Sequence, residues 1–287
     1  MTKTISNILS KSRQILKSCN KVSNVTKLDI EYCLMEVLGK NRAYLHAHGE
    51  EKISNQELIE FNKLLKDILL GKPLAQVLGY QDFYKNKFLI NSNVLIPRIE
   101  TEILIPKILE LGDEIYDKNK QLILIDAGSG SGCIGLSLAI ERKDWTIILI
   151  EKSSKAVEVL LSNCKKHNVS NCTIIMSDWL TAISDKFANI IVSNPPYVDV
   201  GSKQIEDSVK GFEPNTSLYS NENGFSDIKE LIADSKRVLV NDGLLILENG
   251  FNQSAKVSSL LEKNYYKDID IILDYNGINR FTLSRYS

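Results

Sequence analysis

The sequence predicts an α/β fold, in which helices cover a mostly parallel sheet and a small helical domain precedes it. Beyond residue 121, strand-like segments alternate with helix-like segments. The strand-like segments are continuously apolar, which is typical of parallel strands that helices cover on both faces. Before about residue 70, apolar side chains recur at the spacing of one face of an amphipathic helix.

Two capping boxes mark helix starts in the first part of the chain. Thr26 precedes Asp29 by three positions, and Ser54 precedes Glu57 by three positions. In this motif each side chain accepts a hydrogen bond from the other residue's backbone N–H, which satisfies donors that a helix start leaves free. We therefore predict helices that begin near Thr26 and Ser54.

The character of the sequence changes twice, and the changes predict three parts. Residues 1–80 form the helical domain. Residues 81–97, where aromatic and β-branched residues flank turn formers, are expected to form a linking β-hairpin. Residues 98–287 hold the alternating segments and are expected to form the α/β domain.

The α/β domain is expected to contain strands at 122–126, 146–151, 172–177, 188–194, 244–248, 269–273 and 281–286. Asn276-Gly277 lies between the last two segments and favours a tight turn, so we expect that pair to be antiparallel. Residues 199–224 show no pattern of regular structure and follow the fourth strand, which is typical of a loop that covers a substrate. We expect this stretch to become ordered when a partner binds.

A glycine-rich loop follows the first strand and opens a helix. The loop consists of Gly128, Ser129, Gly130, Ser131 and Gly132. Glycines at this position let the backbone approach a ligand closely, although a tight turn without a ligand is the plain structural alternative. With Gly135 the spacing also satisfies the dinucleotide fingerprint, so a nicotinamide-dependent dehydrogenase is a rival at this point.

Acidic and aromatic residues follow the next two strands. Glu151 ends the second strand, where a carboxylate can accept hydrogen bonds from both ribose hydroxyls. Asp178 can accept from an exocyclic amine of adenine, and Trp179 can stack on the ring. The structural alternatives are a solvated strand end for Glu151, a turn acid for Asp178 and a core position for Trp179.

The run Asn194, Pro195, Pro196 and Tyr197 ends the fourth strand, at the sheet edge where open α/β folds bind ligands. The prolines fix φ and remove two N–H donors, so the loop presents acceptors in a fixed direction. The Asn194 side-chain oxygen and the Pro195 carbonyl can each take one N–H of a planar NH₂ group and hold it for in-line attack on a sulfonium methyl, while Tyr197 packs on its plane. A hydride-transferring enzyme has no use for this loop. The plain structural alternative is a strand end that prolines stiffen. The loop thus favours a nitrogen methyltransferase that needs no metal.

The chain resembles the protein-(glutamine-N5) methyltransferases that modify class-1 peptide chain release factors. The resemblance covers nearly all of the chain from Pro73 onward. It rests on Pro73-Leu74-Ala75-Gln76, Leu95-Ile96-Pro97-Arg98 with Glu100-Thr101-Glu102, the glycine loop, Ser177-Asp178-Trp179, Val192-Ser193-Asn194-Pro195-Pro196-Tyr197 and Phe212-Glu213-Pro214.

The resemblance implies an N-terminal helical bundle that docks a release factor, a hairpin and a seven-stranded, Rossmann-like class I methyltransferase domain. It implies S-adenosyl-L-methionine as cofactor, S-adenosyl-L-homocysteine as product, and the glutamine of a Gly-Gly-Gln loop as substrate. By matching position, Gly128 to Gly132, Glu151, Trp179 and Asn194 contact the cofactor, and Asn194 to Tyr197 hold the glutamine amide.

The sequence departs from the family pattern at two places. Glu151 stands where the family usually has Asp, which lengthens the side chain by one methylene. Glu248-Asn249-Gly250 stands where the family usually has Glu-His-Gly. The second departure lies outside the loop to which we assign the chemistry.

Composition narrows the class of protein. Formal net charge is −1, which does not favour a nucleic-acid substrate. No apolar run is long enough to cross a bilayer and residues 1–12 show no signal-peptide core, so we expect a cytoplasmic protein. We also expect a monomer, although no sequence pattern indicates the oligomeric state. The five cysteines and three histidines lack metal-ligand spacing, so no metal is expected. Two alternatives stay open: an adenine-N6 nucleic-acid methyltransferase, and a non-catalytic module that binds S-adenosyl-L-methionine.

Overall fold

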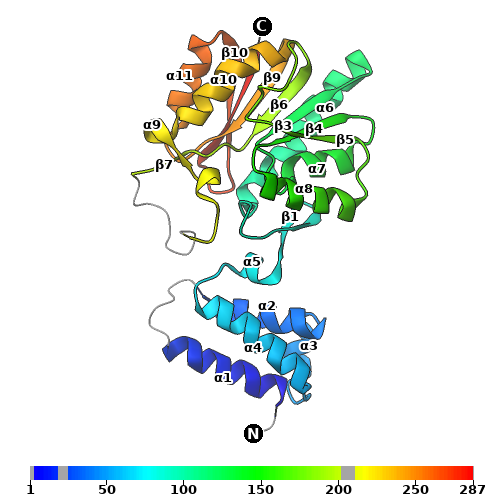
Figure 1. Cartoon of the computed structure of the whole chain (residues 1–287), viewed down its shortest axis with the longest axis vertical. Helices are drawn as coiled ribbons and strands as arrows, with labels where there is room; N and C mark the ends of the chain where they lie inside the picture. Colours follow the sequence, from blue (N-terminus) through cyan, green and yellow to red (C-terminus); the bar gives the residue numbers. More distant parts are fainter. Residues whose placement is uncertain (1–2, 19–24, 202–210, 287) are drawn as a thin grey trace. The chain divides into compact units, whose positions relative to one another are not determined.

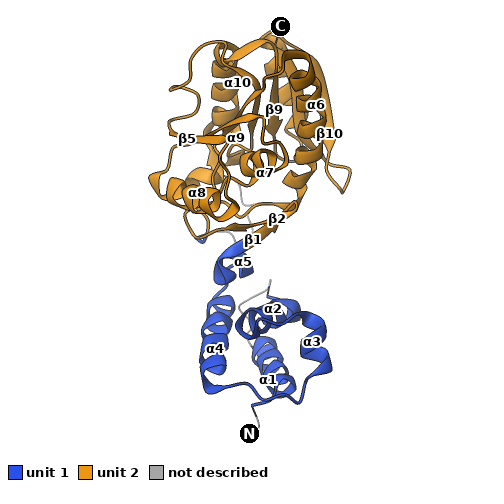
Figure 2. Ribbon diagram, turned by 90° about the vertical axis from the view of Figure 1, so that its right-hand side faces the viewer, with its two compact units in different colours: residues 1–80, 205–212 blue, residues 81–204, 213–287 orange. Residues whose placement is uncertain are grey.

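The computed structural model describes residues 3–18, 25–201 and 211–286, and the chain divides into two compact units. Unit 1 comprises residues 1–80 and 205–212, and unit 2 comprises residues 81–204 and 213–287 (Figure 2). None of the described helices is long and apolar enough to span a membrane.

Unit 1 is a helical bundle around its own apolar core. Its helices are α1 (Ile5–Ser18), α2 (Lys27–Leu38), α3 (Arg42–Ala47), α4 (Asn55–Leu69) and α5 (Leu74–Leu78). Both predicted capping boxes are confirmed, one at Thr26 and Asp29 before α2 and the other at Ser54 and Glu57 before α4. Phe61 of α4 is fully buried in the core, together with apolar residues of α1 and α2.

A short hairpin follows the helices. Strands β1 (Tyr80–Phe83) and β2 (Asn86–Leu89) form a two-stranded sheet. Phe83 and Phe88 are buried edge-to-face, with ring centroids 6.2 Å apart, in the same core as one face of the large sheet. Aromatic pairs in this arrangement add stability beyond the area that they bury.

Unit 2 is built on a seven-stranded mixed sheet, which confirms the predicted α/β class. Its strands, in spatial order, are β10 (Tyr266–Leu273), β11 (Asn279–Tyr286), β9 (Leu239–Glu248), β6 (Ala188–Ser193), β3 (Ile123–Ala127), β4 (Thr146–Glu151) and β5 (Cys172–Met176). Strands β9, β6, β3, β4 and β5 run parallel. Strand β11 is antiparallel to both neighbours, as expected for its pairing with β10.

Helices cover both faces of the sheet (Figure 1). One face packs against α6 (Leu104–Asn119), α7 (Cys133–Glu141) and α8 (Ser154–His167), and the other packs against α10 (Ser226–Val238) and α11 (Ser254–Lys263). Neighbouring residues of β3 show the alternation: Leu124 belongs to the first core and Ile125 to the second. The sequence patterns did not predict α6 or α11.

Part of the stretch expected to lack regular structure is ordered. It contains β7 (Val198–Asp199), η2 (Asn215–Ser217), β8 (Tyr219–Ser220) and the turn α9 (Asn221–Gly224), and a further short 3-10 helix, η1 (Ile99–Ile103), precedes α6. Strands β7 and β8 pair in parallel. Local patterning could not predict them because a two-residue strand exists only through its partner. Residues 202–210 of that stretch lie outside the described residues.

Gly112 lies where α6 packs against a large side chain. A Cβ atom at this position would lie 2.1 Å from the ring of Trp145, which is itself fully buried. We predict that Gly112→Ala lowers the free energy of unfolding by about 1–3 kcal/mol, because overpacking outweighs the better helix propensity of alanine. Denaturant unfolding measures the change. Glu114→Ala, on the exposed side of the same helix, is the control, and equal stability of the two variants would contradict the prediction.

Candidate active site

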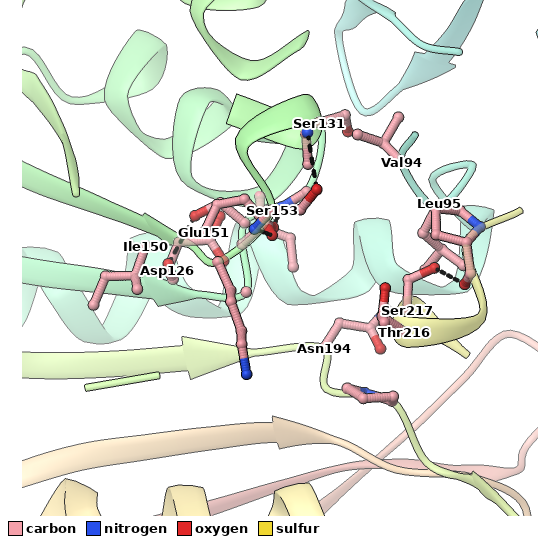
Figure 3. Close-up of a pocket in the computed structure, with 18 of the residues that line it drawn as sticks. Val94, Leu95, Asp126, Ser131, Ile150, Glu151, Ser153, Asn194, Thr216 and Ser217 are labelled. Carbon is pink, nitrogen blue, oxygen red and sulfur yellow. Dashed lines mark hydrogen bonds between the residues drawn. The ribbon is translucent and has the colours of Figure 1, made fainter. Parts of the chain in front are cut away.

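The carboxyl ends of the parallel strands border a cavity of about 350 Å³ in unit 2. The loops after β3, β4, β5 and β6 contribute to its wall, together with residues from 93–101 and 214–219. In Figure 3, Asp126, Ile150 and Glu151 lie on the left of the cavity, and Leu95, Thr216 and Ser217 lie on the right. This is the edge at which open α/β sheets bind their ligands.

The glycine loop folds back onto strand β4. The backbone N–H groups of Gly128 and Ser129 both donate to the carbonyl of Ile150, at 2.9 and 2.8 Å. Gly132 has φ +83°, and a Cβ atom there would lie 2.3 Å from a methyl carbon of Leu160. A side chain at Gly132 would therefore be strained in its backbone and would collide with α8. The predicted loop residues do line the cavity, except Gly132.

Glu151 contacts the glycine loop directly. Its Oε2 accepts from the N–H of Gly130 at 2.9 Å, and its Oε1 accepts from the N–H of Ser153 at 2.8 Å. Each carboxylate oxygen keeps a further lone pair for a ligand. The Glu151 side chain is one methylene longer than an Asp side chain. Glu151 nevertheless contacts the glycine loop and lines the cavity.

Asp126 is a buried acid in the cavity wall that the sequence reasoning passed over. Its Oδ2 accepts from the N–H of Gly135 at 2.9 Å, and burial raises the pKa of this carboxyl to about 7. A Cβ atom on Gly135 would approach that same oxygen to 3.0 Å, so glycine fits this position best. The available signal was an acid that ends an apolar strand directly before a glycine loop.

Asp178 and Trp179 both line the cavity, as their place after β5 predicts. Asp178 forms an ion pair with Lys152 at 2.6 Å, a lysine that the sequence reasoning missed. Both side chains are half exposed or more, and such a pair contributes little to stability. The Trp179 ring lies close to Gly128 and also packs on the core beneath α10 and α11, so a place in the core and a place on the cavity wall are compatible for this residue.

Asn163 supports the glycine loop from behind. This fully buried side chain accepts from the N–H of Leu89 at 2.7 Å and donates to the carbonyls of Leu89 and Ser131, both at 2.9 Å. Asn163 therefore joins helix α8 to both the hairpin and the glycine loop. Nothing in the local sequence distinguishes it from a solvated helix residue.

The loop Asn194 to Tyr197 leaves β6 beside the glycine loop. Ser193 anchors its start, because the Ser193 hydroxyl donates to the carbonyl of Ala127 at 2.6 Å. Asn194 and Pro196 line the cavity, whereas Pro195 and Tyr197 do not. Within the described part of the chain, the Asn194 side-chain amide has no hydrogen-bond partner.

Tyr197 is held below the cavity wall. Its hydroxyl donates to Oε1 of Glu248 at 3.2 Å, and its backbone carbonyl accepts from Nε2 of Gln253 at 2.9 Å. Glu248 ends β9 and is 51 positions away in the chain, yet its carboxylate reaches the loop to which the chemistry is assigned. Its neighbour Asn249, which replaces the usual His, is buried and bonds Thr282 and Ser254.

Two contacts fix further segments at the cavity. Arg98 pairs with the buried Glu213 at 2.9 Å, and Thr101 donates to Oε2 of Glu248 at 2.7 Å. Burial raises the pKa of Glu213, and the charge of Arg98 opposes that shift. Arg98 and Thr101 both line the cavity. No group of three or more potential metal ligands occurs among the residues that the structure describes.

The strand order assigns the fold. In dinucleotide-binding sheets the parallel order 3-2-1-4-5-6 continues to the edge. Here the last strand, β11, instead inserts antiparallel between β9 and β10. A glycine loop after the first strand and an acid after the second complete the arrangement of a class I methyltransferase domain.

Comparison with known proteins identifies the family. Residues 7–79 match the PrmC N-terminal domain, and residues 100–212 match the methyltransferase small domain. The release factor glutamine methyltransferase of Aliivibrio fischeri is 34% identical over 100% of this chain and 99% of its own length. Those of Francisella tularensis (34%; 97% and 96%) and Escherichia coli (32%; 93% and 94%) are similarly related. The chain belongs to the release factor glutamine methyltransferase family.

Solved structures agree on the fold. The human Mettl16 catalytic domain superimposes with a TM-score of 0.52 at 17% identity, over 82% of each chain. A methyltransferase from Pyrococcus furiosus gives 0.51 at 13% identity, over 78% of this chain and 98% of that one.

Asn163→Ala is expected to lower the free energy of unfolding by about 2–3 kcal/mol, because it leaves buried backbone groups without partners. It should also speed hydrogen exchange of the amides in residues 129–132, measured by mass spectrometry. The control is Asn171→Ala, which removes hydrogen bonds to three carbonyls at and just after the C-terminal end of α7. The Asn171 variant should lose stability without loosening the glycine loop, and equal exchange in both variants would contradict the assignment.

Proposed function

We propose that this protein transfers a methyl group from S-adenosyl-L-methionine to the side-chain amide nitrogen of the glutamine in the Gly-Gly-Gln loop of class-1 release factors. Asn194 is the observation that carries the proposal. Its side-chain amide, which has no hydrogen-bond partner among the described residues, lies on the wall of a cavity that the glycine loop and Glu151 also line. Asn194 is partly exposed to the cavity, so its amide is free to bind a ligand there.

The residues around the cavity fit the proposed cofactor. Glu151 offers two lone pairs suited to a ribose diol, and the glycine loop brings backbone close to the space beside it. Asp126 adds a buried carboxyl, and Asp178 with Trp179 adds an acceptor and an aromatic face suited to a purine. We assign cofactor contacts to the cavity-lining residues Gly128, Ser129, Gly130, Ser131, Glu151, Asp178, Trp179 and Asn194, and to Gly132, which does not line the cavity, we assign the turn that holds the loop in place. Their chemistry needs no metal.

When bound, the cofactor supplies an electrophilic methyl group on a sulfonium, and the product is S-adenosyl-L-homocysteine. The work of the chain is orientation. The Asn194 oxygen and the Pro195 carbonyl each accept one N–H of the glutamine amide, which holds the NH₂ plane and stabilises positive charge as it develops on nitrogen. Pro196 lines the cavity beside Asn194. The N–CH₃ bond forms as the S–CH₃ bond breaks, and the excess proton on the nitrogen passes to solvent water after transfer.

We propose that the two parts of the chain share the work. Residues 1–80 dock the release factor, residues 81–97 link the parts, and residues 98–287 carry out the transfer. The match of residues 7–79 to the N-terminal domain of this family supports the first assignment. We expect the enzyme to act as a monomer in the cytoplasm, where its proposed substrate works with the ribosome.

The direct test mixes the purified protein, labelled S-adenosyl-L-methionine and a class-1 release factor, and then locates the added methyl by mass spectrometry. Label on the loop glutamine is the expected result. A release factor with that glutamine replaced should stay unlabelled. Label on adenine in added nucleic acid, with none on the factor, would replace the proposal by an adenine-N6 activity. No transfer despite cofactor binding would leave the non-catalytic module.

Asn194→Ala should lower kcat on the order of 10²-fold or more, because it removes one oriented contact to the reacting group. Cofactor affinity should change far less, since other residues make most of the proposed contacts. Steady-state kinetics and calorimetry measure the two effects. Asn119→Ala, at the end of α6 and away from the cavity, is the control. An Asn194 variant with wild-type kcat would remove this residue from the mechanism.

Glu151→Ala should raise the Kd for S-adenosyl-L-methionine about 10-fold or more, because a hydrogen bond to a charged group contributes roughly 1.5–3 kcal/mol. Titration calorimetry measures Kd. The exposed Glu158 on α8 does not line the cavity, so Glu158→Ala should bind normally. Unchanged affinity in the Glu151 variant would limit this residue to shaping the glycine loop.

A further inference from the structure

Tyr197 is the last residue of the loop Asn194 to Tyr197, and it is fixed from several directions. Its hydroxyl is bound by Glu248 and its carbonyl by Gln253. A Cβ atom on Gly224 would lie 2.1 Å from that carbonyl oxygen, and one on Gly250 would lie 3.1 Å from the tyrosine ring. The ring packs against the core beneath α10 and α11. Tyr197 thus packs against the core while partly buried, and it does not line the cavity.

Glu248 joins this tyrosine to η1, which contributes Thr101 to the cavity wall. The residue is 1% exposed, and its two carboxylate oxygens take different donors. Oε1 accepts from Tyr197 of the loop, and Oε2 accepts from Thr101 of η1, which lines the cavity. A buried carboxylate is costly unless donors satisfy it, so its presence between two hydroxyls is not explained by packing alone.

We propose that Glu248 is a positioning residue, which holds Asn194 in register with the substrate amide by anchoring the Tyr197 hydroxyl. The proposal rests on the proposed function. Only two prolines separate Asn194 from Tyr197, and proline fixes φ at about −65°, so a shift of the tyrosine passes to the asparagine with little loss. The hydroxyl of Tyr197 then serves orientation, and its ring need not touch the glutamine.

The charge state of Glu248 supports this role. Burial raises the pKa of this carboxyl to about 7. Ionised, the carboxylate accepts from both hydroxyls. Once protonated, one of its oxygens carries an O–H donor and becomes a weaker acceptor, so the bond from the hydroxyl that faces it weakens. The groups that face it among the described residues are Arg280 on β11, which lowers the pKa, Glu100 on η1, which raises it, and the neutral Tyr197 and Cys133. The anchor is therefore complete above about pH 7 and weakens as the pH falls.

The test compares Tyr197→Phe, Glu248→Gln and their double variant in the release-factor assay. Each single variant should lower kcat about 10- to 100-fold, the range that a displacement of the reacting group by about 1 Å produces. Cofactor Kd should stay within about twofold. The double variant should be no slower than the slower single variant, because both changes break one contact. The acidic limb of the wild-type kcat profile, near pH 7, should be absent in Glu248→Gln.

Tyr266→Phe is the matched control. Tyr266 is 3% exposed in the same core as Tyr197, and its hydroxyl bonds Ser235 at 2.7 Å. This variant should lose comparable stability and keep its kcat, which separates positioning from folding. If Glu248→Gln folds poorly, Tyr197→Phe decides alone, since it keeps the packed ring.

Three results would overturn the proposal while wild-type enzyme methylates the factor: unchanged kcat in both single variants, losses that multiply in the double variant, or an equal loss in Tyr266→Phe. A wild-type enzyme that binds cofactor but methylates no release factor overturns the proposed function, and this inference with it.

Discussion

The two hydrogen bonds from Gly128 and Ser129 to the carbonyl of Ile150 determine the shape of the site. They turn the chain back at the end of β3, so that the loop lies on the end of β4 and exposes the cavity between them. Glu151 then extends the same pattern by accepting from Gly130. The arrangement requires positive φ at three glycines, which few other residues tolerate. The residues to which we assign cofactor contacts, helix α7 and the asparagine loop are all placed relative to this turn.

Much of the architecture could be predicted from the sequence because its signals are local. Capping boxes pair residues three positions apart, and parallel strands show as continuous apolar runs. The loops that follow such strands must gather at one edge of a sheet, so the order of the chain alone brings Glu151, Trp179 and Asn194 together. The site residues with a motif or a strand end to mark them were found this way.

The contacts that the sequence could not predict depend on how distant segments pack against one another. Thr101 and Glu248 are 147 positions apart. No sequence pattern predicts that the Glu248 carboxylate binds both Thr101 and Tyr197 of the loop. Asn163 resembles any polar helix residue until the hairpin is placed against it. Tyr197 shows a related limit: its type fits a substrate contact, but its direction is set by a strand end 51 positions later. Side-chain direction follows from packing, which single residues do not encode.

The hairpin of β1 and β2 determines where chimeric proteins of this family can be joined. Phe83 and Phe88 complete the core of the catalytic unit, and the backbone of Leu89 is bonded by Asn163. A segment that the sequence suggests is a linker is therefore part of the core of the domain that follows it. Chimeras that exchange the N-terminal domain between relatives should keep the native hairpin with the methyltransferase domain and place the crossover near Gly79. A crossover after the hairpin would place the other relative's hairpin residues in the core of the methyltransferase domain.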